Sequence, residues 1–100
     1  MNMKSITIPK GVWSASPTPF TENMELDVSS IKSMVEHHLR LGVDGLFLAG
    51  TCGEGPYLRD SDIVTLVRET VNAAQGRLSI SVQVTDNSAV RILDNIKRVA

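Results

Sequence analysis

The sequence predicts an α/β protein in which parallel strands alternate with helices. Three short stretches rich in apolar residues each precede a longer stretch whose apolar residues recur at helical spacing. The connections are short, so each crossover between successive strands contains a helix and is expected to be right-handed. The 100 residues therefore hold three βα units, and no linker or low-complexity segment divides residues 1–100 into separate domains.

Composition excludes several classes of function. Hydrophobic residues make up 42% of the chain and charged residues 21%, which is typical of soluble globular proteins. The formal net charge of -1, with scattered Lys and Arg, does not provide the basic surface that nucleic-acid binding requires. The longest apolar run is far shorter than the roughly 20 residues of a membrane span, and residues 1–10 lack the apolar core of a signal peptide. We therefore expect a cytoplasmic protein with no nucleic-acid or membrane partner.

The first strand is expected at residues 12–16, after an irregular lead-in at residues 1–11. Pro17 and Pro19 have no N–H group to donate to a sheet ladder, so the strand must end before them. A loop that contains Thr18 and Phe20 then leads to the first helix.

Apolar residues at positions 31, 34, 35 and 39 form one stripe of an amphipathic helix over residues 27–41. Asp27 is suited to cap its N-terminus, and Gly42 is suited to end it. His37 and His38 are neighbours on this helix and point about 100° apart, so they are poorly placed to share a metal ion. We expect both histidines to be solvated or hydrogen-bonded within the fold.

The second strand, at residues 46–49, is apolar on both faces, as buried strands of parallel sheets are. It leads into a glycine-rich loop at residues 50–55. A second helix is predicted to start near Asp60, and Gly76 is its stop signal.

Residues 78–85 alternate between apolar and polar side chains, which predicts a strand with one apolar face. If helices cover that face, the polar face points inward, which favours a closed barrel over an open doubly wound sheet. A barrel would place its ligand at the carboxyl ends of the strands, and an open sheet at a topological switch point. Asn87 or Ser88 is expected to cap a third helix, whose apolar stripe runs over residues 89–99.

The chemistry is expected in the glycine loop, residues 50–55. Its glycines permit positive φ and close backbone approach, so consecutive N–H groups can point at one anion, and Thr51 adds a hydroxyl donor. A small carboxylate or a phosphate is the expected guest. The loop lacks the spacing of a Walker phosphate loop or a dinucleotide fingerprint, since the helix follows only near Asp60. A cysteine nucleophile would need a base that the sequence does not identify, and the alternative for Cys52, the only cysteine, is a small buried side chain.

The loop also carries a family resemblance. Gly50-Thr51-Cys52-Gly53-Glu54 at the end of an apolar strand resembles the Gly-[Thr/Ser]-x-Gly-Glu motif of the dihydrodipicolinate synthase and N-acetylneuraminate lyase family. Thr18-Pro19-Phe20, the Gly-Val-Asp-Gly of residues 42–45, and Leu58 agree with the family in order and spacing. The resemblance covers essentially the whole chain. It implies a (β/α)₈ TIM barrel, of which residues 1–100 form about the first three βα units as the N-terminal part of a single domain.

The resemblance further implies a class I aldolase mechanism. A lysine forms a Schiff base with pyruvate or another 2-oxo acid, an aldehyde is the second substrate, and neither a metal nor a cofactor is needed. The lysine and a relay tyrosine fall, in the family order, beyond Ala100, and Lys97 lies on the polar side of an outer helix. A homo-oligomer, tetramer or dimer, is implied as well, and this piece alone is expected to be inactive.

The site residues follow from the same resemblance. Thr51 would bind the substrate carboxylate and join the tyrosine in a proton relay. Ala15 would form the floor of the substrate site, Cys52 would contribute its N–H group, and Gly53 would allow close approach of the substrate. Gly50 and Glu54 would organise the loop.

Two departures leave the reaction open. Dihydrodipicolinate synthases usually have Thr-Thr in the loop and Ser after the Glu, whereas this chain has Thr51-Cys52 and Gly55. A thiol is a weaker donor than a hydroxyl, so carboxylate binding must rely on the backbone N–H groups. A 2-keto-3-deoxy sugar-acid aldolase or dehydratase of the same family, and a non-catalytic anion-binding relative, are the alternatives.

Overall fold

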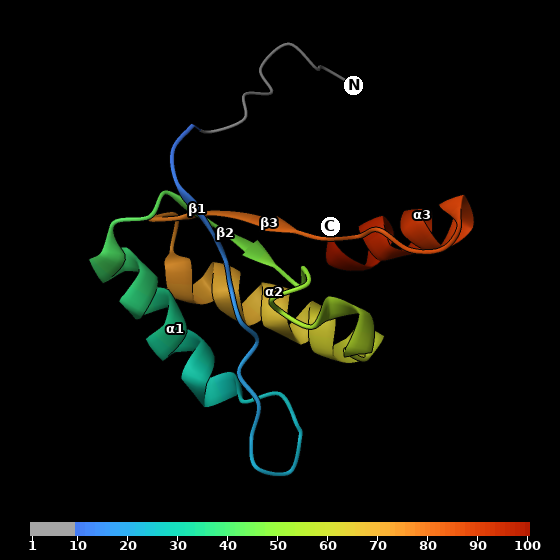
Figure 1. Ribbon diagram of the computed structural model, residues 1–100, viewed down its shortest axis with the longest axis horizontal. Helices are drawn as coiled ribbons and strands as arrows, with labels where there is room; N and C mark the ends of the chain where they lie inside the picture. The colour runs from blue at the N-terminus through green and yellow to red at the C-terminus, as the bar shows by residue number, and fades with distance from the viewer. Residues whose placement is uncertain (1–9) are drawn as a thin grey trace.

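The computed structural model describes residues 10–100, which form a three-stranded parallel sheet and three α-helices (Figure 1). In chain order the elements are β1 (Trp13–Ala15), α1 (Val28–Leu41), β2 (Gly45–Leu48), the 3-10 turn η1 (Gly55–Tyr57), α2 (Asp60–Ala74), β3 (Ser79–Val82) and α3 (Ala89–Val99). The strands lie in the order β1-β2-β3, and both pairs are parallel. The predicted alternation of strands and helices is confirmed. The expected lead-in lies mostly outside the described residues.

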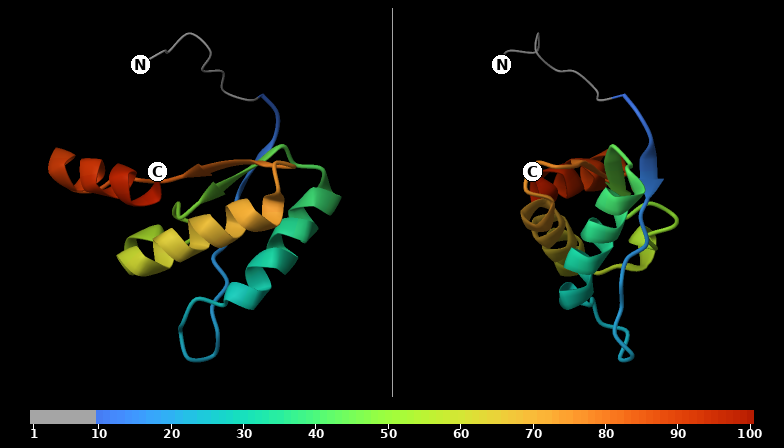
Figure 2. Two further views of the ribbon diagram at one scale, coloured as in Figure 1. Left: turned by 180° about the vertical axis from the view of Figure 1, so that it is seen from behind. Right: turned by 90° about the vertical axis from the view of Figure 1, so that its left-hand side faces the viewer.

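One face of the sheet packs against α1 and α2, and α3 extends past the end of the sheet (Figures 1 and 2). Leu46 and Leu48 of β2 are buried against the two helices, and Ile80 and Val82 of β3 pack against the same cluster. The apolar face predicted for the third strand therefore meets the helices. The buried core is Ile31, Val35, Leu46, Leu48, Leu66, Ala74 and Leu78.

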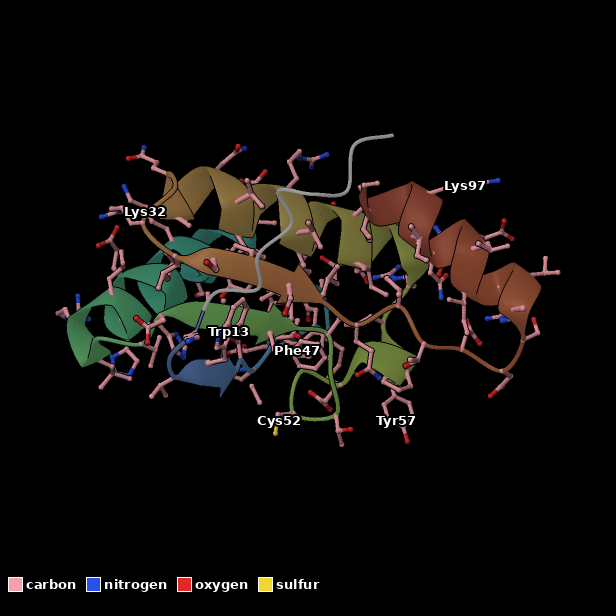
Figure 3. The ribbon with its side chains drawn as sticks, turned by 90° about the horizontal axis from the view of Figure 1, so that it is seen from above. Trp13, Lys32, Phe47, Cys52, Tyr57 and Lys97 are labelled. Atoms are coloured by element: carbon pink, nitrogen blue, oxygen red, sulfur yellow. The ribbon has the colours of Figure 1, made fainter. Side chains whose placement is uncertain are left out.

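The opposite face of the sheet carries the alternate residues of each strand, and no helix of residues 10–100 covers it (Figure 2). In the strand register Ala15 lies beside Phe47, and Phe47 lies beside Ser81. Trp13 lies beside Gly45, where a Cβ atom would come within 2.6 Å of the Trp13 ring. Glycine at position 45 therefore leaves room for that ring on the uncovered face. Figure 3 shows Trp13 and Phe47 lying close to the sheet.

The histidine prediction is confirmed. His37 is exposed, whereas His38 is buried between α1 and β1. Its Nδ1 atom lies 2.8 Å from the Met34 carbonyl oxygen and its Nε2 atom 2.9 Å from the Ser14 hydroxyl. A carbonyl only accepts, so Nδ1 must carry a proton and donate it. Within residues 10–100, no group of three or more His, Cys, Asp or Glu side chains gathers in a way that could hold a metal ion.

The predicted helix ends are confirmed with one adjustment. The Asp27 carboxylate accepts a hydrogen bond from the Ser30 N–H at 3.2 Å, and Gly42 ends α1 with φ of +79°. Ser88 rather than Asn87 caps α3. Gly76 has φ of +75°, but α2 already ends one residue earlier, because Gln75 also adopts a left-handed conformation. No helix in the described range is long and apolar enough to cross a membrane.

Candidate functional site

The glycine loop begins where β2 ends, at the carboxyl edge of the sheet. Ala49 turns the chain out of the strand with φ of +58°, so the strand ends one residue earlier than predicted. The loop then closes on itself: the N–H groups of Gly53 and Gly55 both donate to the Gly50 carbonyl oxygen at 3.1 Å. The N–H of Glu54 donates to the Thr51 carbonyl oxygen, also at 3.1 Å. The result is a compact turn that leads directly into η1.

Of the two properties that the glycines permit, close approach is the one the loop uses, since Gly50, Gly53 and Gly55 do not adopt positive φ. Positive φ occurs instead at Ala49 and at Glu54, which has φ of +57°. A Cβ atom at Gly55 would overlap the Ala49 carbonyl group, and one at Gly50 would lie 2.8 Å from the Phe47 ring. A Cβ atom at Gly53 would lie 3.0 Å from the carbonyl oxygen of Ser16 and 3.1 Å from the Ala49 nitrogen. The three glycines therefore let the loop fold against β2 and the segment that follows β1.

Thr51 and Cys52 lie at the outer end of this turn. Both residues are exposed. The interpretation of Cys52 as a small buried side chain is therefore wrong, and Figure 3 shows Cys52 at the outside of the loop. Neither backbone N–H donates to a carbonyl oxygen anywhere in residues 10–100. They resemble the free N–H groups of the first turn of a helix, which commonly bind anions. With the Thr51 hydroxyl, the loop therefore has three exposed donors close together in the sequence.

Of the other two predicted substrate-binding residues, Gly53 is buried within this turn and Ala15 lies next to it. Ala15 is exposed on the uncovered sheet face beside Phe47. The following residue, Ser16, donates its N–H to the Phe47 carbonyl oxygen at 3.2 Å and lies against Gly53. The structure thus brings the end of β1 and the glycine loop together at one edge of the sheet.

Glu54 contributes to the loop through its backbone. Its side chain is exposed and accepts no hydrogen bond from residues 10–100. Its carbonyl oxygen accepts from the Tyr57 N–H at 2.9 Å, and Glu54 is the residue that precedes η1. Its left-handed conformation is uncommon for a residue with a Cβ atom, and such a conformation persists only where neighbouring contacts hold it.

Thr18 is a residue of the site to which the sequence analysis assigned no role. It lies between β1 and α1, is 7% exposed, and donates its hydroxyl to the Gly53 carbonyl oxygen at 2.6 Å. The signal in the sequence was its position between Pro17 and Pro19. That pattern does not reveal the partner, which is 35 residues away.

A network of polar side chains lies at the turn between β3 and α3. Asp86 accepts hydrogen bonds from Arg91 Nε at 2.8 Å, from the Asn87 N–H at 2.7 Å and from Asn95 Nδ2 at 3.2 Å. The Arg91 hydrogen bond, followed by those from Asn87 and Asn95, lowers the pKa of Asp86 to about 2. A cavity of about 450 Å³ separates this network from the backbone of the glycine loop at Gly55. Sequence reasoning did not predict the network.

The fold and the loop define a class of protein: a parallel α/β protein with a glycine-rich turn, carrying free backbone N–H groups, at the carboxyl end of its second strand. The chain belongs to the dihydrodipicolinate synthetase family, whose sequence model matches residues 8–95. The family resemblance seen in the loop motif is thereby confirmed.

Individual relatives agree with this assignment. The chain is 34% identical over 90 residues to the 4-hydroxy-tetrahydrodipicolinate synthase of an Exiguobacterium species. The matched region covers 90% of this chain and 31% of the relative. A dihydrodipicolinate synthase from Acinetobacter baumannii, solved in complex with pyruvate, matches with a TM-score of 0.85 at 25% identity over 89% of this chain and 31% of its own. An N-acetylneuraminate lyase from Mycoplasma synoviae matches with a TM-score of 0.81 at 26% identity, over 89% of this chain and 31% of its own. The chain spans about a third of the length of these proteins.

Proposed function

We propose that this chain supplies the carboxylate-binding loop of a lyase that forms a lysine Schiff base with pyruvate or another 2-oxo acid. The observation that carries the proposal is the pair of free N–H groups at Thr51 and Cys52, next to the exposed Thr51 hydroxyl. Family membership supports the lyase chemistry, and the Acinetobacter relative was solved with pyruvate bound.

In this proposal the loop holds one end of the substrate. The N–H groups of Thr51 and Cys52 bind the carboxylate, and this fixes where the neighbouring carbonyl carbon lies. The small side chain of Ala15 leaves room beneath the substrate, and Gly53, whose missing side chain would meet Ser16 and Thr18, lets the loop pack close to the end of β1. As the carbonyl becomes an iminium, the Thr51 hydroxyl passes a proton to or from a tyrosine. Donors held in place before the reaction stabilise developing charge better than water does.

The same proposal explains the uncovered sheet face. In a (β/α)₈ barrel the face that carries Ala15 and Phe47 is the interior, and the carboxyl ends of the strands form the active-site face. The chain would then form about the first three of eight units. Lys32 and Lys97 lie on the side of the molecule away from Cys52 (Figure 3). The Schiff-base lysine is expected from a later strand, as the family resemblance implies. An aldehyde as second substrate, a cytoplasmic location and a homo-oligomer complete the proposal.

The proposal predicts a covalent adduct that depends on Thr51. Full-length protein incubated with pyruvate and borohydride should gain the mass of one reduced pyruvate on a lysine. Thr51→Val should raise the pyruvate concentration for half-maximal trapping by about tenfold, since one hydrogen bond to a charged group contributes about 1.5 kcal/mol or more. Thr65→Val is the control, because the Thr65 hydroxyl is half-buried on α2 and bonds to the Ser61 carbonyl of its own helix. It should leave the pyruvate concentration for half-maximal trapping unchanged.

Cys52→Ser separates this proposal from cysteine catalysis. A lyase should keep its adduct with the serine variant, because the backbone N–H remains, whereas a cysteine hydrolase would lose its activity. Both histidines of the chain lie on α1, and His38 is bonded to Ser14 and Met34 on the helix-covered face, so neither is placed to serve as the base. Absence of any trapped adduct in the full-length protein without substitutions would contradict the proposed function.

A further inference from the structure

The buried hydrogen bond between Thr18 and Gly53 links two segments that are far apart in the sequence. At 2.6 Å it joins the β1–α1 connection to the glycine loop. Gly53 fits closely there, since a Cβ atom would come within 3.1 Å of the Thr18 hydroxyl oxygen. The significance of this bond for catalysis rests on the function proposed above.

The segment that presents the Thr18 hydroxyl is rigid. Pro17 and Pro19 each have a fixed φ, and the residue before a proline is restricted to extended conformations. The segment is also tied at both ends. Ser16 donates its N–H to Phe47, and the Pro19 carbonyl oxygen accepts from the Asp27 N–H at 2.9 Å. The hydroxyl is therefore held in place before it meets the loop, and little entropy is lost when the bond forms.

The peptide unit between Gly53 and Glu54 is held at both ends. Its carbonyl oxygen accepts from Thr18, and its N–H donates to the carbonyl oxygen of Thr51. A flip of this peptide would break both hydrogen bonds. It would also change φ of Glu54 from +57° to a negative value and so release the strain of the left-handed conformation. The Thr18 hydroxyl thus opposes a rearrangement that the backbone of Glu54 would otherwise favour.

We propose that Thr18 is a positioning residue, which keeps the turn of residues 50–55 in the conformation that presents its N–H groups to the substrate carboxylate. Thr18 acts through the Gly53 carbonyl and does not touch the substrate. The hydrogen bond from Thr18 fixes the Gly53–Glu54 peptide, whose N–H in turn donates to the Thr51 carbonyl oxygen. Thr51 is thereby held in place, and its hydroxyl and N–H are two of the three donors.

The test compares two buried threonines. Thr18→Val removes a hydroxyl that makes a hydrogen bond, whereas Thr70→Val removes one that is fully buried on α2 and has no partner within residues 10–100. In full-length protein, Thr18→Val should raise the pyruvate concentration for half-maximal borohydride trapping about tenfold, with the maximal extent of trapping unchanged. Thr18→Ser, which keeps the hydroxyl, should restore the native value, and Thr70→Val should not alter it.

A second readout does not depend on the substrate. Cys52 is exposed and lies next to Gly53, so the rate at which iodoacetamide alkylates it, measured by peptide mass, reports the loop conformation. Thr18→Val should change this rate, and Thr18→Ser should return it to the native value. In a Glu54→Gly background the same Thr18→Val substitution should have a smaller effect on both readouts, because glycine adopts positive φ without strain.

The inference is overturned if Thr18→Val leaves pyruvate dependence and alkylation unchanged, if Thr18→Ser behaves like Thr18→Val, or if Thr18→Val loses its folded structure altogether. The last result would make Thr18 a structural residue only. If the native protein forms no pyruvate adduct, the proposed function fails, while the alkylation rates still decide whether Thr18 holds the loop.

Discussion

The glycine loop shows how single residues serve different purposes in one turn. Ala49 and Glu54 adopt the left-handed conformation, although each has a Cβ atom. The glycines occupy positions where a Cβ atom would meet backbone or an aromatic ring. Replacing a glycine in this loop is therefore expected to destabilise the fold because the new Cβ atom would clash with its neighbours, and not because the backbone there has positive φ.

Gly55→Ala tests this distinction. The new methyl group would overlap the Ala49 carbonyl, which is backbone and cannot turn aside, so we expect a loss of about 2 kcal/mol or more in the free energy of unfolding. Gly76→Ala is the matched control, because Gly76 has φ of +75° but no atom within 4 Å of a Cβ position. It should lose only about 1 kcal/mol from strain. Urea unfolding of both variants measures the difference, and an equal or larger loss at Gly76 would refute the explanation.

At the scale of elements, the helices begin and end largely as their local sequences dictate, but the turn between β3 and α3 depends on a side-chain network. Asp86 accepts hydrogen bonds from Arg91 and Asn95 of α3 as well as from the Asn87 N–H. Asn95 also donates to the Val84 carbonyl oxygen at 3.1 Å. One carboxylate therefore fixes how α3 leaves the sheet.

This network predicts a dependence of stability on pH. Because the pKa of folded Asp86 is lowered to about 2, the unfolded chain takes up a proton near pH 4 while the folded chain does not. The contribution of Asp86 is thus fully present above about pH 4 and is lost as pH falls towards 2. Asp86→Asn should flatten the fall in stability between pH 4 and pH 2, as measured by urea unfolding at a series of pH values. Asp94 lies on α3 and has no hydrogen bond or ion pair within residues 10–100, so Asp94→Asn should leave the fall in stability between pH 4 and pH 2 unchanged.

At the scale of the whole molecule, much apolar surface is uncovered. The apolar stripe predicted for α3 is present, but none of the helix's residues is buried, and Val90, Leu93 and Ile96 are 69%, 56% and 44% exposed. Within residues 10–100, the sheet also has an uncovered face and two open edges, β1 and β3. Surfaces of this kind mark contacts with further protein, and open strands promote association.

We therefore expect the 100-residue chain on its own to self-associate and to form no borohydride-trapped adduct with pyruvate. Sedimentation velocity over a range of concentrations would detect the association, and intact mass would detect the adduct. Leu93→Glu should reduce association by placing a charge on the exposed stripe, whereas Val71→Glu, at an exposed position of α2, should reduce it less. A chain that stays monomeric at all concentrations, or one that forms the adduct, would contradict this expectation.

Apolar periodicity was sufficient to predict the order of strands and helices and the parallel sheet, because these depend on residues that are close in sequence. Residue type predicted the cap at Asp27 and narrowed the cap of α3 to Asn87 or Ser88. The loop motif was sufficient to predict a donor turn and the family. Neither could reveal that Thr18 bonds to Gly53, that Ala49 and Glu54 carry the positive φ, or that Cys52 is exposed. These features arise when β1, β2 and the segments after them pack together, and local sequence does not encode the distances between segments that are 35 residues apart.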